Sequence, residues 1–157
     1  MGHAISAFVA KRPAIAAIAR ELANAPFYRL KHDEFLILPV GDERADAFAE
    51  RRGQSDAIAE EFWQLPAKLA ECARECSVHG LIAFIATDYF GGTGTQAAIA
   101  WNAGRVVFDP EVATSGCINS ALHAIDLHDA PGLDAFDTLG LGEVRAMDDF
   151  EEMTPTI

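Results

Sequence analysis

The sequence predicts one α+β domain, in which a mixed or antiparallel sheet of four or five strands packs with three or four helices. The chain has 157 residues, the length of one ordinary domain. Apolar runs of strand length occur together with segments whose apolar residues recur at helical spacing. A glycine turn at 102–104 joins two of the apolar runs, which favours a hairpin. We therefore expect residues 1–157 to form a single globular domain.

The first forty residues predict two strands separated by a helix. Residues 4–9 are typical of a short strand. Pro13 suits the first turn of a helix, where its missing N–H costs nothing, and the helical spacing continues to about residue 24. Two apolar runs follow at 27–30 and 35–40. They form either a hairpin or a loop that leads into one buried strand.

The helix expected over residues 55–77 has the clearest periodicity in the chain. A shorter helix precedes it, beginning at Asp42 and ending at Gly53. Ser55 is a suitable N-cap for the long helix, and Pro66 predicts a kink or two consecutive helices. The apolar stripe follows the spacing 4, 3, 4, 3, 4 and consists of Ile58, Phe62, Leu65, Leu69, Cys72 and Cys76.

The second half of the chain predicts further strands and one more helix. Residues 81–86 form a nearly continuous apolar run, as in a central strand. The glycine-rich stretch 91–95 follows it. The runs 96–101 and 105–108 flank the hairpin turn, and 118–125 has helical spacing.

Negative charge is concentrated late in the sequence. The chain carries 24 acidic and 12 basic side chains, a net charge of −12. Residues 1–80 have a net charge of −2 and residues 81–157 a net charge of −10. This composition argues against binding to nucleic acid or anionic membranes, because phosphates are bound by clustered Lys and Arg. Two interpretations stay open, a solvated surface that keeps the protein soluble and a face that attracts a basic partner.

The sequence also predicts a location. The N-terminus lacks the basic region and the long apolar core of a signal peptide, and no apolar run approaches the ~20 residues of a membrane span. Three cysteines are an odd number and do not suggest a disulfide framework. We expect a cytoplasmic protein.

The strand end and glycine loop from Asp88 to Gly94 are the main candidate site. A glycine loop can hold a phosphate, but this one lacks the Gly-Lys-Ser/Thr of a P-loop, so a tight strand-to-strand connection is favoured. A carboxylate at the end of a central strand often faces a cleft. Asp88 could form a general acid/base pair with Asp109 or Glu111.

Several other groupings permit chemistry but have simpler explanations. Cys72, Cys76 and His79 have metal-ligand spacing, yet zinc needs a fourth ligand and the cysteines complete the apolar stripe. Cys117 and His123 could be a nucleophile and its base, although six residues apart near one helix they point in different directions. We predict no metal and no cofactor.

The sequence resembles a known family over nearly its whole length. The most specific part is Tyr89–Gly92, within the segment Asp88–Ala98. The other segments that carry the similarity are residues 2–8, 101–105, 118–122, 134–137, 139–142 and 145–150. Together these segments are similar to a family of small, mostly uncharacterised bacterial cytosolic proteins, some of which resemble immunity proteins of toxin systems. The resemblance implies a binding protein and supplies no catalytic motif. Phe150 stands at an aromatic position that tryptophan occupies in that pattern.

The prediction is therefore a non-catalytic protein-binding module, such as an immunity-type inhibitor whose acidic surface meets a basic partner, for example a toxin. The alternative is a small enzyme or ligand-binding domain with its site in the Asp88–Gly94 loop. Association between copies of the chain stays open. The predicted partner- or ligand-binding residues are Asp88, Tyr89, Phe90, Gly91, Gly92, Gly94, Gln96, Trp101, Asp134 and Asp137.

Overall fold

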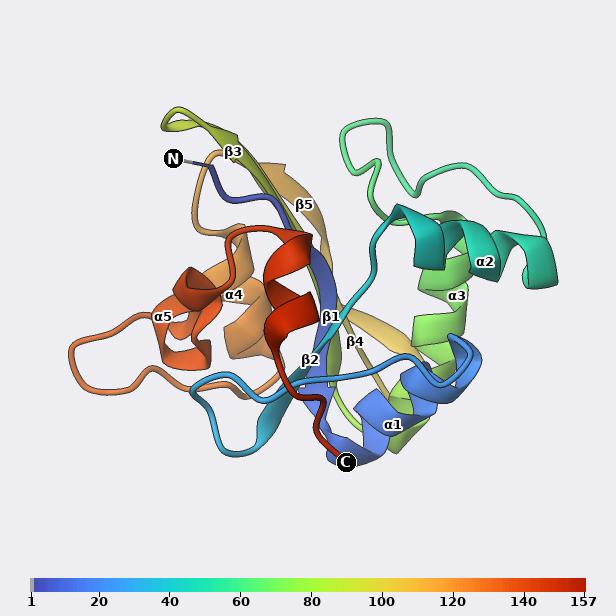
Figure 1. Ribbon diagram of the computed structural model, residues 1–157, viewed down its shortest axis with the longest axis horizontal. Helices are drawn as coiled ribbons and strands as arrows, with labels where there is room; N and C mark the ends of the chain where they lie inside the picture. The colour runs from blue at the N-terminus through green and yellow to red at the C-terminus, as the bar shows by residue number, and fades with distance from the viewer. Residues whose placement is uncertain (1) are drawn as a thin grey trace.

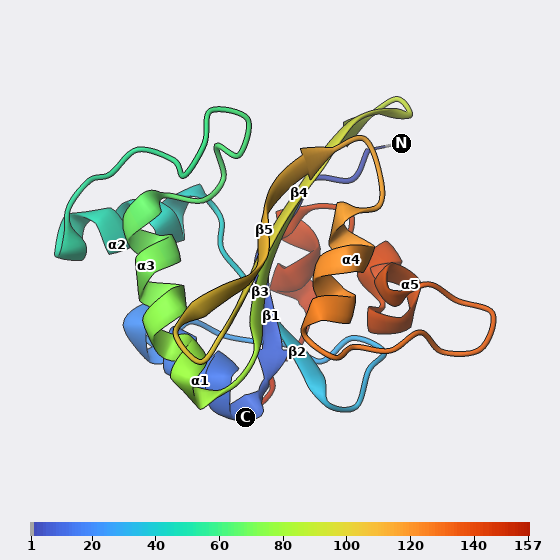
Figure 2. The same ribbon diagram turned by 180° about the vertical axis from the view of Figure 1, so that it is seen from behind.

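A computed structural model describes residues 2–157 as one antiparallel sheet between two layers of helices (Figures 1 and 2). The five strands stand in the order β2-β1-β3-β4-β5, and every neighbouring pair is antiparallel. The predicted α+β class is confirmed. The described residues contain five α-helices, more than the three or four expected. One of them has only five residues, too few to show a helical period in the sequence.

The elements occur along the chain as follows. The strands are β1 (Ser6–Lys11), β2 (Phe35–Pro39), β3 (Ile82–Phe90), β4 (Thr93–Asn102) and β5 (Arg105–Ala113). The α-helices are α1 (Arg12–Glu21), α2 (Asp42–Arg52), α3 (Ala67–Cys76), α4 (Cys117–Ala124) and α5 (Ala135–Leu139). Three 3₁₀ helices complete the set, η1 (Ser77–His79), η2 (Leu141–Glu143) and η3 (Met147–Glu152).

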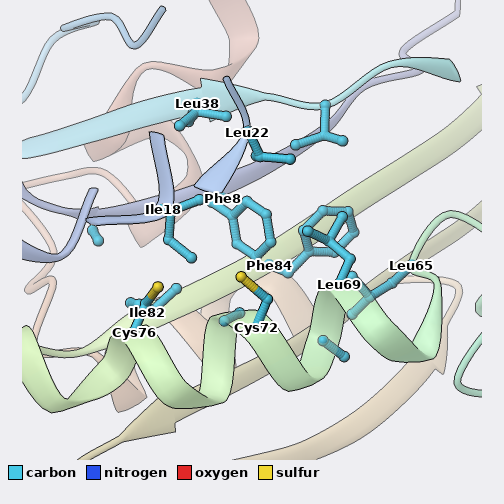
Figure 3. Packing of buried hydrophobic residues seen from close by; sticks show 14 of the residues in the cluster. Phe8, Ile18, Leu22, Leu38, Leu65, Leu69, Cys72, Cys76, Ile82 and Phe84 are labelled. Atoms are coloured by element: carbon cyan, nitrogen blue, oxygen red, sulfur yellow. The ribbon is translucent and has the colours of Figure 1, made fainter. Parts of the chain in front are cut away.

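The first layer consists of α1, α2, α3 and the loop between α2 and α3, and it covers one face of the sheet (Figure 1). Its core is aromatic at the centre. The ring centroids of Phe8 and Phe84 lie 4.9 Å apart, and those of Phe62 and Phe84 lie 6.0 Å apart. Side chains from α1 and α3 close over these rings (Figure 3). Burying such side chains is the main favourable term in folding.

The second layer consists of residues 114–157, with α4, α5, η2 and η3, and it covers the opposite face (Figure 2). Successive residues of β3 alternate between the two cores. Phe84 belongs to the first core, whereas Ile85 packs with Leu122 of α4 in the second. Because both faces of β3 are covered, the strand has the continuous apolar run noted in the sequence.

The prediction of a helix over residues 55–77 is wrong for residues 55–66. The helix begins at Ala67, with Pro66 as N-cap, and residues 53–66 form a loop. Phe62 and Leu65 are nevertheless fully buried, so the spacing predicted burial correctly but not helix. Pro66 has no N–H for a helical hydrogen bond and restricts the residue before it, which disfavours one continuous helix.

Ser55 does act as a cap, but for a helix that begins twelve residues later. Its hydroxyl accepts a hydrogen bond of 3.0 Å from the backbone N–H of Lys68, in the first turn of α3. Pro66, at the N-cap position, makes no side-chain cap hydrogen bond. The loop therefore folds back, so that a residue near its start caps the helix that follows its end.

Three further predictions concern the end of the first helix, the conformation of residues 27–40 and the hairpin at 102–105. The helix after Pro13 ends at Glu21, earlier than expected. Of the two readings of residues 27–40, the structure has a loop followed by a buried strand, with a single bridge between Tyr28 and Ile37. The hairpin at 102–105 is confirmed, with Ala103 and Gly104 in the left-handed region.

Among residues 2–157, no helix combines the length and the apolar character that crossing a membrane requires.

Candidate functional site

The glycine loop is a tight hairpin turn at an exposed tip of the sheet. Phe90 pairs with Thr93, which leaves Gly91 and Gly92 as the two turn residues, with φ of +62° and +85°. Positive φ at both positions is the two-residue hairpin geometry that glycine adopts at little cost. The Phe90 side chain at this tip is 85% exposed. The predicted strand-to-strand connection is confirmed.

Gly94 is required for a different reason. It lies opposite Tyr89 in the register, and a Cβ at this position would overlap the carbonyl oxygen of Asp88. Its φ of +150° adds strain for any other residue. The third glycine of the loop is thus explained by close backbone approach.

The strand before the turn sends its side chains to opposite faces. Asp88 lines a groove of about 370 Å³ on the first layer's face, together with Asp46 and the exposed Trp63. Tyr89 lines a cavity of about 290 Å³ on the second layer's face. Because strand side chains alternate, the predicted Asp88–Gly94 patch is divided between two sites.

The proposed acid/base pairing of Asp88 with Glu111 is wrong. Glu111 pairs with Ala98, whose side chain belongs to the second core. Asp88 faces the groove of the first layer. The sheet therefore separates the two carboxylates. Asp109 lies on β5, and β4 stands between that strand and β3.

The cavity on the second face brings together three of the predicted residues, Tyr89, Gln96 and Asp134. The Gln96 amide nitrogen donates to the Tyr89 hydroxyl over 3.1 Å, and its carbonyl oxygen accepts from the backbone N–H of Ile118 over 2.9 Å. Gln96 thereby ties the hairpin to the first turn of α4. Tyr89 donates in turn to the carbonyl of Thr114.

His3 also lines this cavity, although it is not among the residues predicted from the sequence. Its Nε2 lies 2.9 Å from the carbonyl oxygen of Leu141, which only accepts, so Nε2 carries the proton. Its Nδ1 therefore accepts from the Thr87 hydroxyl over 2.7 Å, and the oxygen of that hydroxyl accepts from the N–H of Ile5. Both ring nitrogens are therefore occupied, and His3 is not free to act as a general base. No local spacing could have found a contact across 138 residues.

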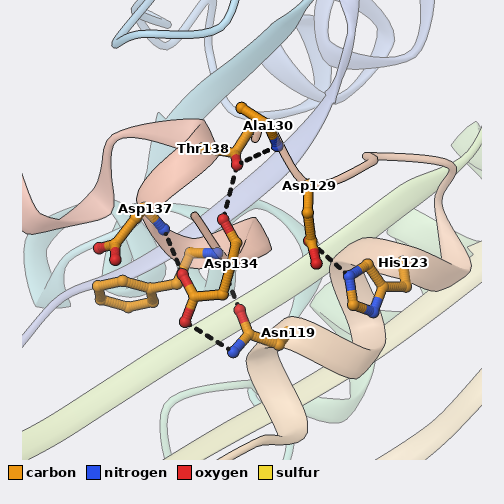
Figure 4. A network of polar contacts seen from close by, with 8 residues as sticks. Asn119, His123, Asp129, Ala130, Asp134, Asp137 and Thr138 are labelled. Atoms are coloured by element: carbon orange, nitrogen blue, oxygen red, sulfur yellow. Dashed lines mark hydrogen bonds and ion pairs between the residues drawn. The ribbon is translucent and has the colours of Figure 1, made fainter. Parts of the chain in front are cut away.

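Asp134 and Asn119 form a polar network at the start of α5 (Figure 4). The Asp134 carboxylate accepts from the N–H of Asp137 over 2.8 Å and from the Asn119 amide over 3.1 Å. Asn119 Oδ1 accepts from the N–H of Phe136 over 2.8 Å. Asp134 is thus a helix cap whose oxygens serve the fold. The carboxylate of Asp137 makes no hydrogen bond within the described chain.

Trp101 does not belong to the candidate site. Its side chain is 2% exposed and packs in the first core near Phe8, with ring centroids 6.5 Å apart. Cys117 and His123 do not pair either. The Cys117 thiol is fully buried against the carbonyl of Gln96, whereas the exposed His123 lies 2.7 Å from Asp129. Among residues 2–157, no three His, Cys, Asp or Glu side chains converge as a site with three or more protein ligands would require.

The two layers hold similar numbers of acidic residues but differ in net charge. The second layer, residues 114–157, holds nine carboxylates and one arginine, a net charge of −8. The helices and loop of the first layer, residues 12–21 and 42–76, hold ten carboxylates and seven basic side chains, a net charge of −3. All nine carboxylates of the second layer are on exposed residues. The nearby segment 29–34 adds two basic and two acidic side chains.

Six of these nine carboxylates make no hydrogen bond or ion pair within residues 2–157. The other three serve the fold, since Asp129 meets His123, Asp134 caps α5 and Asp149 accepts from two backbone N–H groups near η3. The free ones are Asp126, Asp137, Glu143, Asp148, Glu151 and Glu152. The second layer thus presents carboxylates whose charge is not neutralised by the fold.

Comparison of the chain with protein-family models, with curated proteins and with solved structures gave no match.

Proposed function

We propose that this protein is a non-catalytic binding module whose second layer docks a basic protein. The observation that carries the proposal is the charge division described above, nine exposed carboxylates against a single arginine in residues 114–157. Complementary charge raises the rate of encounter with a basic partner and disfavours acidic ones. An inhibitor of a toxin, as the family resemblance implies, is the specific form of this proposal.

The polar network beside the surface supports binding rather than catalysis. In this cavity His3 is hydrogen-bonded to the Thr87 hydroxyl and the Leu141 carbonyl. Tyr89 and Gln96 are hydrogen-bonded to each other and to the backbone. A nucleophile and base would need to be free to exchange a proton with a substrate. A rigid, internally satisfied network instead holds α4 and α5 in fixed positions, as a docking surface requires.

Matched charge variants test this proposal. One variant neutralises four free carboxylates of the second layer, Asp126→Asn, Asp137→Asn, Glu151→Gln and Glu152→Gln. The control neutralises four exposed carboxylates of the first layer, Asp46→Asn, Glu50→Gln, Glu60→Gln and Glu61→Gln. Each protein is used for affinity capture from cells that naturally produce the chain, and captured proteins are identified and purified for affinity measurements.

The expected partner is a basic protein that binds the wild type and the control with similar affinity. The second-layer variant should bind at least about tenfold more weakly, and added salt should reduce the difference. If the partner is a toxin, the chain should inhibit it. Failure to capture a basic protein, or equal affinity of the two variants for it, would contradict the proposal.

Ligand binding at the 290 Å³ cavity is a second candidate, because the fold brings Tyr89, Gln96 and Asp134 together there. Nuclear magnetic resonance shifts measured during titration with small polar metabolites would test it. Shifts confined to His3, Asn119 and Phe136 would favour a ligand site. Uniform or absent shifts would leave the cavity as part of the structural network.

A further inference from the structure

Two cysteines lie one turn apart on α3, at the edge of the first core. Cys72 and Cys76 are free thiols, 8% and 9% exposed. Both line a cavity of about 410 Å³ between α1, α2 and α3. Figure 3 shows the two sulfur atoms on the same side of the helix. Residues four apart share a helix face, so this juxtaposition follows directly from their spacing.

The two thiols are close enough to influence each other's ionisation. Their interaction lowers the pKa of Cys76 and raises that of Cys72. Burial opposes ionisation of both sulfurs.

The charged groups around the pair come from all three helices. Arg20 favours the Cys76 thiolate and Arg52 the Cys72 thiolate, while Glu21 opposes both. Glu21 is itself paired with Arg52. The remaining charged or titratable groups that line the cavity are Lys68, Glu71, Glu75 and His79. Glu71 is paired with Arg74, which reduces its effect on the thiols.

We propose that Cys72 and Cys76 together bind one soft monovalent metal ion, such as Cu(I), between their two sulfur atoms. Thiolates are the protein ligands that such ions prefer. The ion forms two metal–sulfur bonds and displaces both S–H protons to solvent, which leaves a complex with a net charge of −1. No electron is transferred. Arg20 and Arg52 stabilise that negative charge.

The same geometry disfavours zinc. A structural zinc site needs four ligands, and no third His, Cys, Asp or Glu converges with these sulfurs in residues 2–157. His79, which completes the spacing in the sequence, is exposed. The third cysteine, Cys117, lies in the other core. It is a matched single-thiol control.

Competition with a coloured Cu(I) chelator, under anaerobic and reducing conditions, tests the proposal. The wild type should bind one ion per chain. Because two linked ligands bind far more tightly than one, Cys72→Ser and Cys76→Ser should each weaken binding by about 10²–10⁴-fold. Cys117→Ser should bind as the wild type does. Thermal melting establishes that each variant is folded.

Measurements on the wild type alone keep the proposal testable if a serine variant does not fold. X-ray absorption of the Cu(I) complex should give two sulfur neighbours, and titration in weak buffer at neutral pH should release two protons per ion. Failure to bind Cu(I), coordination by a different number of sulfurs, or full binding by Cys72→Ser would overturn it. None of these results depends on the protein partner proposed above.

Discussion

The two layers of this protein pack on the same sheet but differ in the balance of acidic and basic side chains. In the first layer, ten carboxylates are interspersed with seven basic side chains, and ion pairs such as Arg52–Glu21 and Arg74–Glu71 link them. In the second layer, nine carboxylates accompany a single arginine. Both layers bury an extensive apolar core. Packing and net charge therefore vary independently in this protein, and the unneutralised carboxylates belong to one layer.

The layers also differ in how their backbone is organised. The first layer includes a loop of fourteen residues, 53–66, whose side chains are partly in the core. The second layer connects short helices through caps contributed by neighbouring elements, such as Gln96 at α4 and Asn119 at α5. Both layers use polar caps from outside their helices, but only the first also depends on the buried side chains of a long loop, a difference that mutations can test.

The largest expected effect is at Phe62, in the loop of the first layer. Phe62→Ala removes a fully buried ring that packs 6.0 Å from Phe84, measured between ring centroids. We expect a loss of about 3–5 kcal/mol in unfolding free energy, measured by chemical denaturation. Trp63→Ala is the control, because the next side chain is 58% exposed and should cost far less. Equal losses would mean that the loop does not pack as described.

The Cys117 thiol gives the second layer a dependence on alkaline pH. Burial raises the pKa of Cys117 from 9.0 to about 11. The folded state therefore favours the neutral thiol. This contribution is complete below pH 9.0 and is lost as the pH rises through about 11. Relative to Cys117→Ala, the wild type should lose about 1–3 kcal/mol across this window. Parallel stability profiles of the two proteins would contradict the assignment.

Removing the remote caps should have effects of about 1 kcal/mol each. Ser55→Ala leaves the N–H of Lys68 without its acceptor in the first layer, and Asn119→Ala does the same to Phe136 in the second. Asn119→Ala should be the more costly, because it also removes the donor to Asp134. Thermal melting of both variants measures the difference, with Ser120→Ala, an exposed neighbour, as control.

The smallest expected change in stability comes from neutralising carboxylates of the second layer. The fourfold neutralisation of the second layer described above should raise stability by about 0.5 kcal/mol at low ionic strength, since it relieves repulsion among carboxylates. The matched first-layer variant should gain less, because basic neighbours already offset its carboxylates. Salt should remove the difference. A gain in the first layer equal to that in the second would indicate that the charge division has no local consequence.

Patterns of neighbouring residues are enough to predict the class of fold and most of the buried side chains. The apolar run of β3, the Asn102–Arg105 turn and the glycine hairpin were all predicted, because each depends on neighbours close in the chain. The sequence also located the negative charge after residue 80. It did not distinguish loop from helix at 55–66, because the same apolar spacing suits a helix and a loop whose side chains reach one core.

Which residues contact one another depends on how the chain folds in three dimensions. Asp88 and Tyr89 are adjacent in sequence and lie on opposite faces of the sheet, whereas His3 and Leu141 are distant in sequence and form a hydrogen bond. Ser55 and Asn119 are good capping residues, but each caps a helix that begins more than ten residues later in the chain. The physical reason is the same in each case. A side chain's chemistry is local, while its partners depend on how the strands and layers are brought together in folding.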